Sequence, residues 1–147
     1  MKTHMTKTRL LLSMVFVSML VAGGCARMER PGDGHRVVLQ GAQEVPPVST
    51  TASGTGIIKI GPDRSVSGSI TTSGINATAA HIHEGATGTN GPVIVPLTKT
   101  SDNVWSVPAG AKLTEAQYAG HVARNLYVNV HSAAHPGGEI RGQISGN

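Results

Sequence analysis

The chain has 147 residues, of which 39% are hydrophobic, 14% charged and 3% aromatic, and it contains 19 glycines, 8 prolines and one cysteine. This length suits one domain with a short appendage; the composition excludes a disordered chain, and glycines without a three-residue period exclude collagen. A single cysteine also excludes an intramolecular disulfide or a cysteine-based zinc site.

The first 24 residues predict a secretory signal peptide. Lys2, Lys7 and Arg9 precede an uncharged, apolar segment from Leu10 to Gly24, which is shorter than the ~20 apolar residues of a membrane-spanning helix. The formal net charge of +4 depends on these three bases, because the chain from residue 26 onward has nine Lys and Arg residues against eight acids. The mature protein is therefore almost neutral, and we expect no nucleic-acid partner.

Cys25, the only cysteine, ends this signal-like segment. Residues 22–25 (AGGC) resemble a bacterial lipobox, in which the signal is cut before the cysteine and the sulfur receives a diacylglycerol. The alternative is an ordinary signal peptide cut nearby. We favour the lipid anchor, which predicts a protein secreted across the inner membrane and held in the periplasm or at the cell surface. Residues 25–36, broken by Pro31, Gly32 and Gly34, predict a flexible tether.

The remaining residues, 37–147, predict one all-β domain. No segment keeps a 3.6-residue apolar period, whereas short β-branched runs recur between Gly, Pro, Asn and Ser clusters. We predict a Greek-key sandwich or barrel of about eight antiparallel strands. The expected strands are 37–41, 54–60, 66–72, 77–83, 92–97, 103–107, 125–131 and 139–145. A short helix or turn is expected at Leu113–Ala119, opened by Thr114 as a cap.

Strand alternation separates a polar from an apolar face in the last two strands. If these strands pair as a hairpin across the turn at residues 135–138, six polar side chains share one surface. They are Tyr127, Asn129, His131, Glu139, Arg141 and Gln143. The same rule sends His81 and His83 outward together, while Ala80 and Ile82 point inward.

His81, His83 and His131 are the candidate metal ligands. Residues i and i+2 of a strand lie about 6.5 to 7 Å apart on one face, so two imidazoles can lean onto one ion. His131 adds a third imidazole beside a Gly-rich turn, a set that suits copper(II) or zinc(II). The alternative is three surface histidines that bond to loops. Glu44 either offers a carboxylate to the metal or to Arg141, or is a solvated acid on a rigid turn.

Three longer segments carry a resemblance to a known family. They are LQGAQEVPPV at Leu39–Val48, AAHIHEGATGTNGPV at Ala79–Val93 and LYVNVHSAAHPGGEIRGQI at Leu126–Ile144. These segments resemble the chordin-type (CHRD) domain. They occur in the family's order, and the resemblance covers nearly all of residues 37–145. It implies a secreted or lipid-anchored module in bacteria and a secreted growth-factor antagonist in animals, without a defined reaction. His135 stands where the family usually has Asn, so we leave it out of the site.

Three short segments carry a second, weaker resemblance. They are HIH at 81–83, GPVIVPL at 91–97 and VNVH at 128–131. They follow the order of the corresponding segments in copper-zinc superoxide dismutase, an eight-stranded Greek-key barrel. The comparison implies that His81, His83 and His131 match three of its four copper ligands, whereas Val93 stands at the position of the bridging histidine. The zinc ligands and the disulfide cysteines are missing, and Arg141 does not align with the enzyme's active-site arginine.

We therefore expect an extracytoplasmic, lipid-anchored CHRD domain that binds copper, with zinc as the second candidate, for metal handling or stress protection. Glu44, Asn129, Glu139 and Arg141 would support the three histidines. An interaction module that binds a protein or a glycan without metal is the alternative, and a superoxide-dismutase-like enzyme ranks third. We assign no catalytic residue.

Overall fold

The computed structural model describes residues 34–145, so the predicted signal peptide, Cys25 and nearly all of the predicted tether lie outside the described residues. The described part contains nine strands, one α-helix and one 3-10 helix. The strands are β1 (His35–Gln40), β2 (Ser53–Ile60), β3 (Val66–Ser73), β4 (Ala77–Glu84), β5 (Val93–Pro96), β6 (Thr98–Ser101), β7 (Val104–Ser106), β8 (Leu126–Ser132) and β9 (Ile140–Gln143). The helices are η1 (Gly41–Gln43) and α1 (Glu115–Val122). Neither helix has the length and apolar character needed to cross a membrane.

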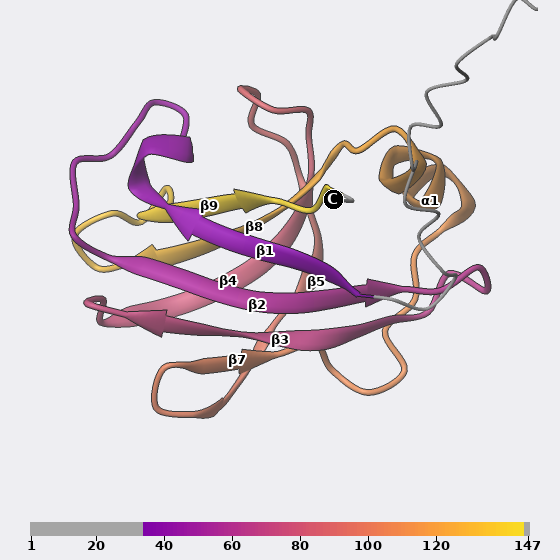
Figure 1. The fold of residues 1–147 in the computed structure, drawn as a ribbon, viewed down its shortest axis with the longest axis horizontal. Helices are drawn as coiled ribbons and strands as arrows, with labels where there is room; N and C mark the ends of the chain where they lie inside the picture. The colour runs from indigo at the N-terminus through magenta and orange to yellow at the C-terminus, as the bar shows by residue number, and fades with distance from the viewer. Residues whose placement is uncertain (1–33, 146–147) are drawn as a thin grey trace, which may run out of the picture.

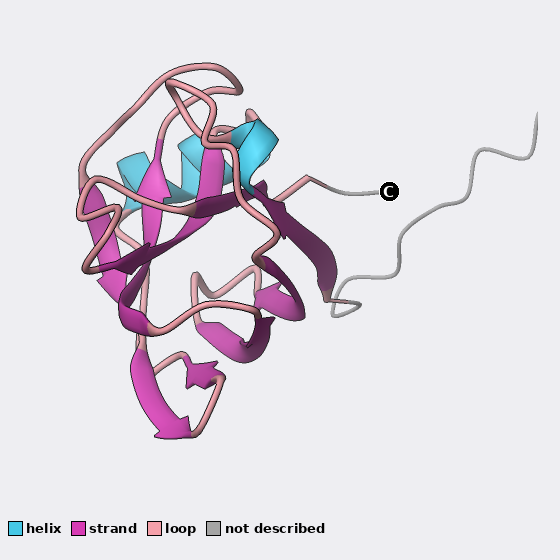
Figure 2. Ribbon diagram, turned by 90° about the vertical axis from the view of Figure 1, so that its left-hand side faces the viewer, coloured by secondary structure: helices cyan, strands magenta, loops and turns pink. Residues whose placement is uncertain are grey.

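All nine described strands belong to one antiparallel sheet, in the order β5-β4-β8-β9-β1-β2-β3-β7-β6. The sheet curls on itself, so that β1, β2 and β3 lie in front of β4 in Figure 1, and it forms a nearly closed barrel. α1 lies at one end of the barrel, on the right in Figure 1 and behind the strands in Figure 2. The predicted all-β class is confirmed.

Aliphatic side chains that alternate along the strands fill the barrel. Ile58 on β2 and Ile70 on β3 are fully buried, while residues beside them point to solvent. Burying such a side chain stabilises the fold by about 1.5–3 kcal/mol. β8 differs, because every residue from Leu126 to Val130 is buried. Its outer face must therefore be covered as well as its inner face.

Two loops cover the outer face of β4, β8 and β9. The first loop follows β1 at residues 41–52, and the second joins β4 to β5 at residues 85–92. Nδ2 of Asn90 in the second loop donates to the carbonyl oxygen of Val45 in the first at 2.7 Å. Nε2 of Gln143 on β9 donates to the carbonyl oxygen of Gly85 at 2.9 Å.

These loops change the expected exposure of the polar face. Asn129 is 3% exposed and Arg141 is 1% exposed, so a face predicted to lie at the surface is largely enclosed. Strand alternation assigned these residues to the same face correctly. It carries no information on whether a distant loop folds over that face.

Eight of the nine strands coincide with predicted segments, and their ends shift by at most two residues. The sequence analysis missed β6, a sheet-edge strand in which all four residues are exposed and polar.

α1 starts slightly later than expected, at Glu115, and Thr114 caps it as predicted. The backbone N–H of Gln117 donates to Oγ1 of Thr114 at 3.2 Å, and the backbone N–H of Thr114 donates to Oε1 of Gln117 at 2.9 Å.

Candidate metal centre

Three histidines come together on the outer face of β4 and β8. In the antiparallel register, His81 lies opposite Asn129, and His131 lies opposite Ala79. His131 is thus a diagonal neighbour of His81, a relation that places residues about 7–8 Å apart. His83 follows on the same face of β4. The structure therefore supplies the neighbouring strands that a three-histidine site requires.

The imidazole nitrogens are close enough to share one ion. One ligand nitrogen from each of His81, His83 and His131 lies within 4.8 Å of the other two. The closest approach joins Nδ1 of His81 to Nε2 of His131 at 3.0 Å. Three nitrogens that bind one ion with bonds of about 2 Å lie about 3.3 to 3.5 Å apart. No separation in the cluster exceeds 4.8 Å, so the three nitrogens lie close to the spacing of a three-nitrogen site.

Backbone carbonyl groups orient two of the rings. Nδ1 of His83 donates to the carbonyl oxygen of Gly91 at 2.9 Å, and Nδ1 of His131 donates to that of Pro136 at 2.9 Å. Because a carbonyl oxygen can only accept, the proton of each neutral ring is on Nδ1 and a lone pair is on Nε2. His81 Nδ1–H then donates to the lone pair of His131. Nε2 of His83 is buried and has no hydrogen-bond partner.

Burial keeps two of the histidines neutral. Desolvation lowers the pKa of His81 below its usual value of 6.5, and the positive charges that His131 and His83 can carry lower it further. Desolvation also lowers the pKa of His83, with smaller contributions from His131 and Arg141, although the hydrogen bond to Gly91 acts in the opposite direction. Neutral imidazole is the form that binds a metal ion. Both rings therefore present lone pairs at neutral pH.

Tyr127 holds the His83 ring from one side. The two rings are stacked, with centroids 4.8 Å apart and planes within 10°. The guanidinium carbon of Arg141 lies 3.5 Å from the centroid of the Tyr127 ring, a cation–π contact. The Tyr127 hydroxyl accepts from the backbone N–H of Gly91 at 3.1 Å. Tyr127 thus contacts both Arg141 and His83 and holds the His83 ring in place.

Comparison with known proteins places this chain in a family. The family model described as the CHRD domain matches residues 36–144, which include all three histidines. The chain belongs to the CHRD family. No curated protein and no solved structure matches it, and the similarity to copper-zinc superoxide dismutase has no support from these comparisons. CHRD domains typically occur in extracellular proteins.

The polar residues expected to support the histidines occupy different places in the CHRD domain. Asn129 and Arg141 lie in the enclosed layer beside the cluster, each opposite the other across β8 and β9. Glu139 lies apart from them, and its carboxylate accepts from Oγ1 of Thr50 at 2.8 Å. The metal-ligand group found in the described residues contains the three histidines and no carboxylate. Glu44 is thus outside it.

Glu44 is buried rather than solvated, with 5% of its surface exposed. Its Oε1 accepts a hydrogen bond from Nδ2 of Asn129 at 2.6 Å. Burial raises the pKa of Glu44 to about 7, although Arg141 and a hydrogen bond from the Val45 backbone lower it. The sequence left open whether Glu44 is a solvated acid or offers its carboxylate to the metal or to Arg141. The structure contradicts the solvated acid and places Glu44 in the buried polar layer with Asn129 and Arg141.

Arg141 connects β9 to the loop over the site. Nη2 of Arg141 donates to the carbonyl oxygen of Ala86 at 3.1 Å, and Nη1 donates to Oδ1 of Asn90 at 3.3 Å. Asn90 in turn binds the other loop through Val45. The sequence analysis did not assign Asn90, Gly91 or Tyr127 to the site. Tyr127 could have been assigned to the site from the sequence, because strand alternation places it on the same polar face of β8 as His131.

Proposed function

We propose that this CHRD domain binds a copper ion through His81, His83 and His131. The observation that carries the proposal is Nε2 of His83, which is buried without a partner while its Nδ1 is held by the Gly91 carbonyl oxygen. Leaving a buried polar atom unpaired costs about 1–3 kcal/mol. A metal ion would accept this lone pair and that of His131, in place of the hydrogen bond from His81, and it would bind the His81 ring through a nitrogen that carries no proton.

Copper is favoured over zinc by the ligand set. The described cluster offers three imidazoles, and imidazole suits both metals. For the same nitrogen ligands copper(II) binds more tightly than zinc in the Irving–Williams order. His81 and His131 are only partly buried, so a fourth coordination position is accessible from solvent. Such a site suits an extracellular role in metal handling or protection from metal stress.

Binding without turnover is the role supported by the surroundings. Val93, at the position that the superoxide dismutase comparison gives to a bridging histidine, lies opposite His83 on β5 and is 48% exposed. A valine side chain has no atom that can bind a second metal. A dismutase-like reaction therefore ranks behind binding, and copper-loaded protein should remove superoxide no faster than a small copper–peptide complex.

We also propose that a diacylglycerol on Cys25 holds the domain at a membrane facing the periplasm or the cell exterior. This rests on the AGGC motif at residues 22–25 and on the apolar segment before it. The residues between Cys25 and the start of β1 at His35 would then link the domain to the membrane.

Metal content and copper(II) affinity of the tag-free chain test the metal proposal. We expect one copper per chain by elemental analysis, and an electron paramagnetic resonance spectrum with nitrogen couplings from imidazole. His83→Ala should weaken copper(II) binding at least tenfold, because it removes one of three ligands. His135→Ala is the matched control, since His135 lies in the same region but outside the cluster. The absence of stoichiometric copper, or equal losses in both variants, would refute the proposal.

A further inference from the structure

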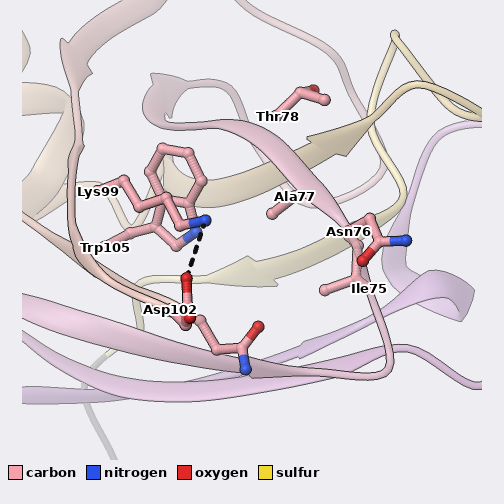
Figure 3. A pocket seen from close by; sticks show the side chains of 8 residues that line it. Ile75, Asn76, Ala77, Thr78, Lys99, Asp102 and Trp105 are labelled. Atoms are coloured by element: carbon pink, nitrogen blue, oxygen red, sulfur yellow. Dashed lines mark ion pairs between the residues drawn. The ribbon is translucent and has the colours of Figure 1, made fainter.

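A second feature lies where the barrel fails to close. β5 and β6 are the two ends of the sheet order, and no pairing joins them. A cavity of about 460 Å³ lies between the start of β4 and the hairpin of β6 and β7. Figure 3 shows the side chains that line it, among them Asn76, Lys99, Asp102 and Trp105. Its volume is within the usual range of ligand pockets, about 300–1,000 Å³.

The wall of this cavity contains an unpaired donor. Trp105 on β7 is 5% exposed, and its Nε1 is buried without a hydrogen-bond partner. Buried polar atoms are nearly always paired, so this N–H is available to an acceptor from outside the chain. Lys99 lies opposite Trp105 in the register of β6 and β7. Its half-exposed side chain passes in front of the indole in Figure 3, so a ligand that reaches the N–H has to displace Lys99.

The two charged side chains at the mouth of the cavity, Lys99 and Asp102, have opposite signs. Nζ of Lys99 lies 3.6 Å from Oδ1 of Asp102, the ion pair marked in Figure 3. A ligand with a net charge would meet one attractive and one repulsive group. The amides of Asn76 and Asn103 each offer both donors and an acceptor. The cavity therefore favours an uncharged ligand that both donates and accepts hydrogen bonds.

Part of the lining is apolar. Ile75 is nearly buried and Ala77 packs against the core, and both lie on the cavity wall. A ring with hydroxyl groups around its edge and C–H groups on its faces matches such a wall with polar groups beside it. We infer that this cavity binds a hexose unit of a neutral glycan, with Trp105 Nε1, Asn76 and Asp102 as its hydrogen-bond partners.

This glycan site is separate from the histidine cluster. None of the residues that line the cavity belongs to the metal-ligand group. The register of β4 against β8 shifts between Ala77 and Ala79, and Ala77 packs against the core, whereas His81 and His83 face outward. Glycan binding is thus expected with and without metal, and His83→Ala should leave it unchanged.

Trp105 makes the test direct, because it is the only tryptophan of the chain. The full chain is titrated with chitotriose, cellotriose, maltotriose and mannotriose, and with trigalacturonic acid as an anionic comparison. We expect a saturable change in tryptophan emission with at least one neutral trisaccharide, and a matching affinity by isothermal titration calorimetry. Trigalacturonic acid should bind at least tenfold more weakly than that sugar.

Substitutions locate the bound sugar by calorimetry. Trp105→Phe keeps an aromatic ring but removes the N–H, and Asn76→Ala removes an exposed amide; each should weaken binding at least fivefold. Thr98→Ala is the matched control, because Thr98 is on β6 but does not line the cavity. No saturation with any neutral trisaccharide, tighter binding of trigalacturonic acid, or unchanged affinity in both Trp105→Phe and Asn76→Ala would each overturn the assignment.

Discussion

Gly138 is the position where a single methyl group should disturb the enclosed polar layer most. Its φ is +132°, a backbone conformation that side chains rarely allow. A Cβ atom at this position would collide with Nδ2 of Asn129 and would lie 2.8 Å from Oε1 and 3.0 Å from Oε2 of Glu44. Those atoms belong to the buried hydrogen bond between Asn129 and Glu44. Gly138→Ala must therefore strain the backbone and separate that pair.

The size of the effect follows from these two costs. A residue with a side chain in such a backbone region costs about 1–3 kcal/mol. Breaking the hydrogen bond between Asn129 and Glu44 leaves buried polar atoms unpaired, at a further cost of about 1–3 kcal/mol. We expect Gly138→Ala to lower the free energy of unfolding by about 3 kcal/mol or more. The thermal midpoint should then fall by roughly 10 to 20 °C.

Thermal unfolding followed by circular dichroism measures this change, and the neighbouring glycine supplies the control. A Cβ at Gly137 would meet no atom within 4 Å, and Gly137 is not among the described glycines with positive φ. Gly137→Ala should therefore leave the midpoint within a few degrees of the original protein. If the two variants unfold within about 1 kcal/mol of each other, the steric argument is refuted.

Three further predictions concern protons and the membrane. Because the pKa of Glu44 is raised to about 7, the unfolded chain releases a proton between pH 4.5 and 7 that the folded chain keeps, and the free energy of unfolding falls as pH rises through this range. In Glu44→Gln, the free energy of unfolding measured by urea denaturation at pH 4, 6 and 8 should lack this decrease; a difference between the original protein and the variant that is the same at all three pH values would contradict the prediction. The lowered pKa values of His81 and His83 should keep copper(II) affinity constant from pH 8 to 7 and reduce it only below 6.5, as protons begin to compete; a decline that starts above pH 7 counts against this. Cys25→Ser should release the protein from membranes, whereas retention after a carbonate wash would remove the lipid anchor.

The sequence predicted the strands, the shared faces and the grouping of His131 with His81 and His83, but not the strand register that brings them together. The i, i+2 spacing of His81 and His83 placed them on one face correctly. Which strand pairs with β4 is a long-range choice, since His81 and His131 are 50 residues apart. The stack of Tyr127 on His83 depends on that register, so residue spacing alone could not reveal it.

Two other features were invisible for different reasons. β6 has four exposed residues and no apolar alternation, so the pattern that marked the other strands was absent there. The burial of Glu44 depends on how residues 41–52 and 85–92 fold over the sheet. Loops of this kind are held by individual hydrogen bonds, such as that from Asn90 to Val45, which leave no periodic signal in a sequence.

The burial of β8 on both faces has a consequence for hydrogen exchange. Amide protons of a strand enclosed between the core and two loops exchange only when the whole domain opens, whereas those of an exposed edge strand exchange through local fraying. We therefore expect slow exchange in β8, which carries His131, and fast exchange in β6, which borders the Trp105 cavity. A copper ion should slow exchange in the 85–92 loop with little change in β8, while a sugar should slow exchange in β6. The two ligands would thus protect separate regions of one domain.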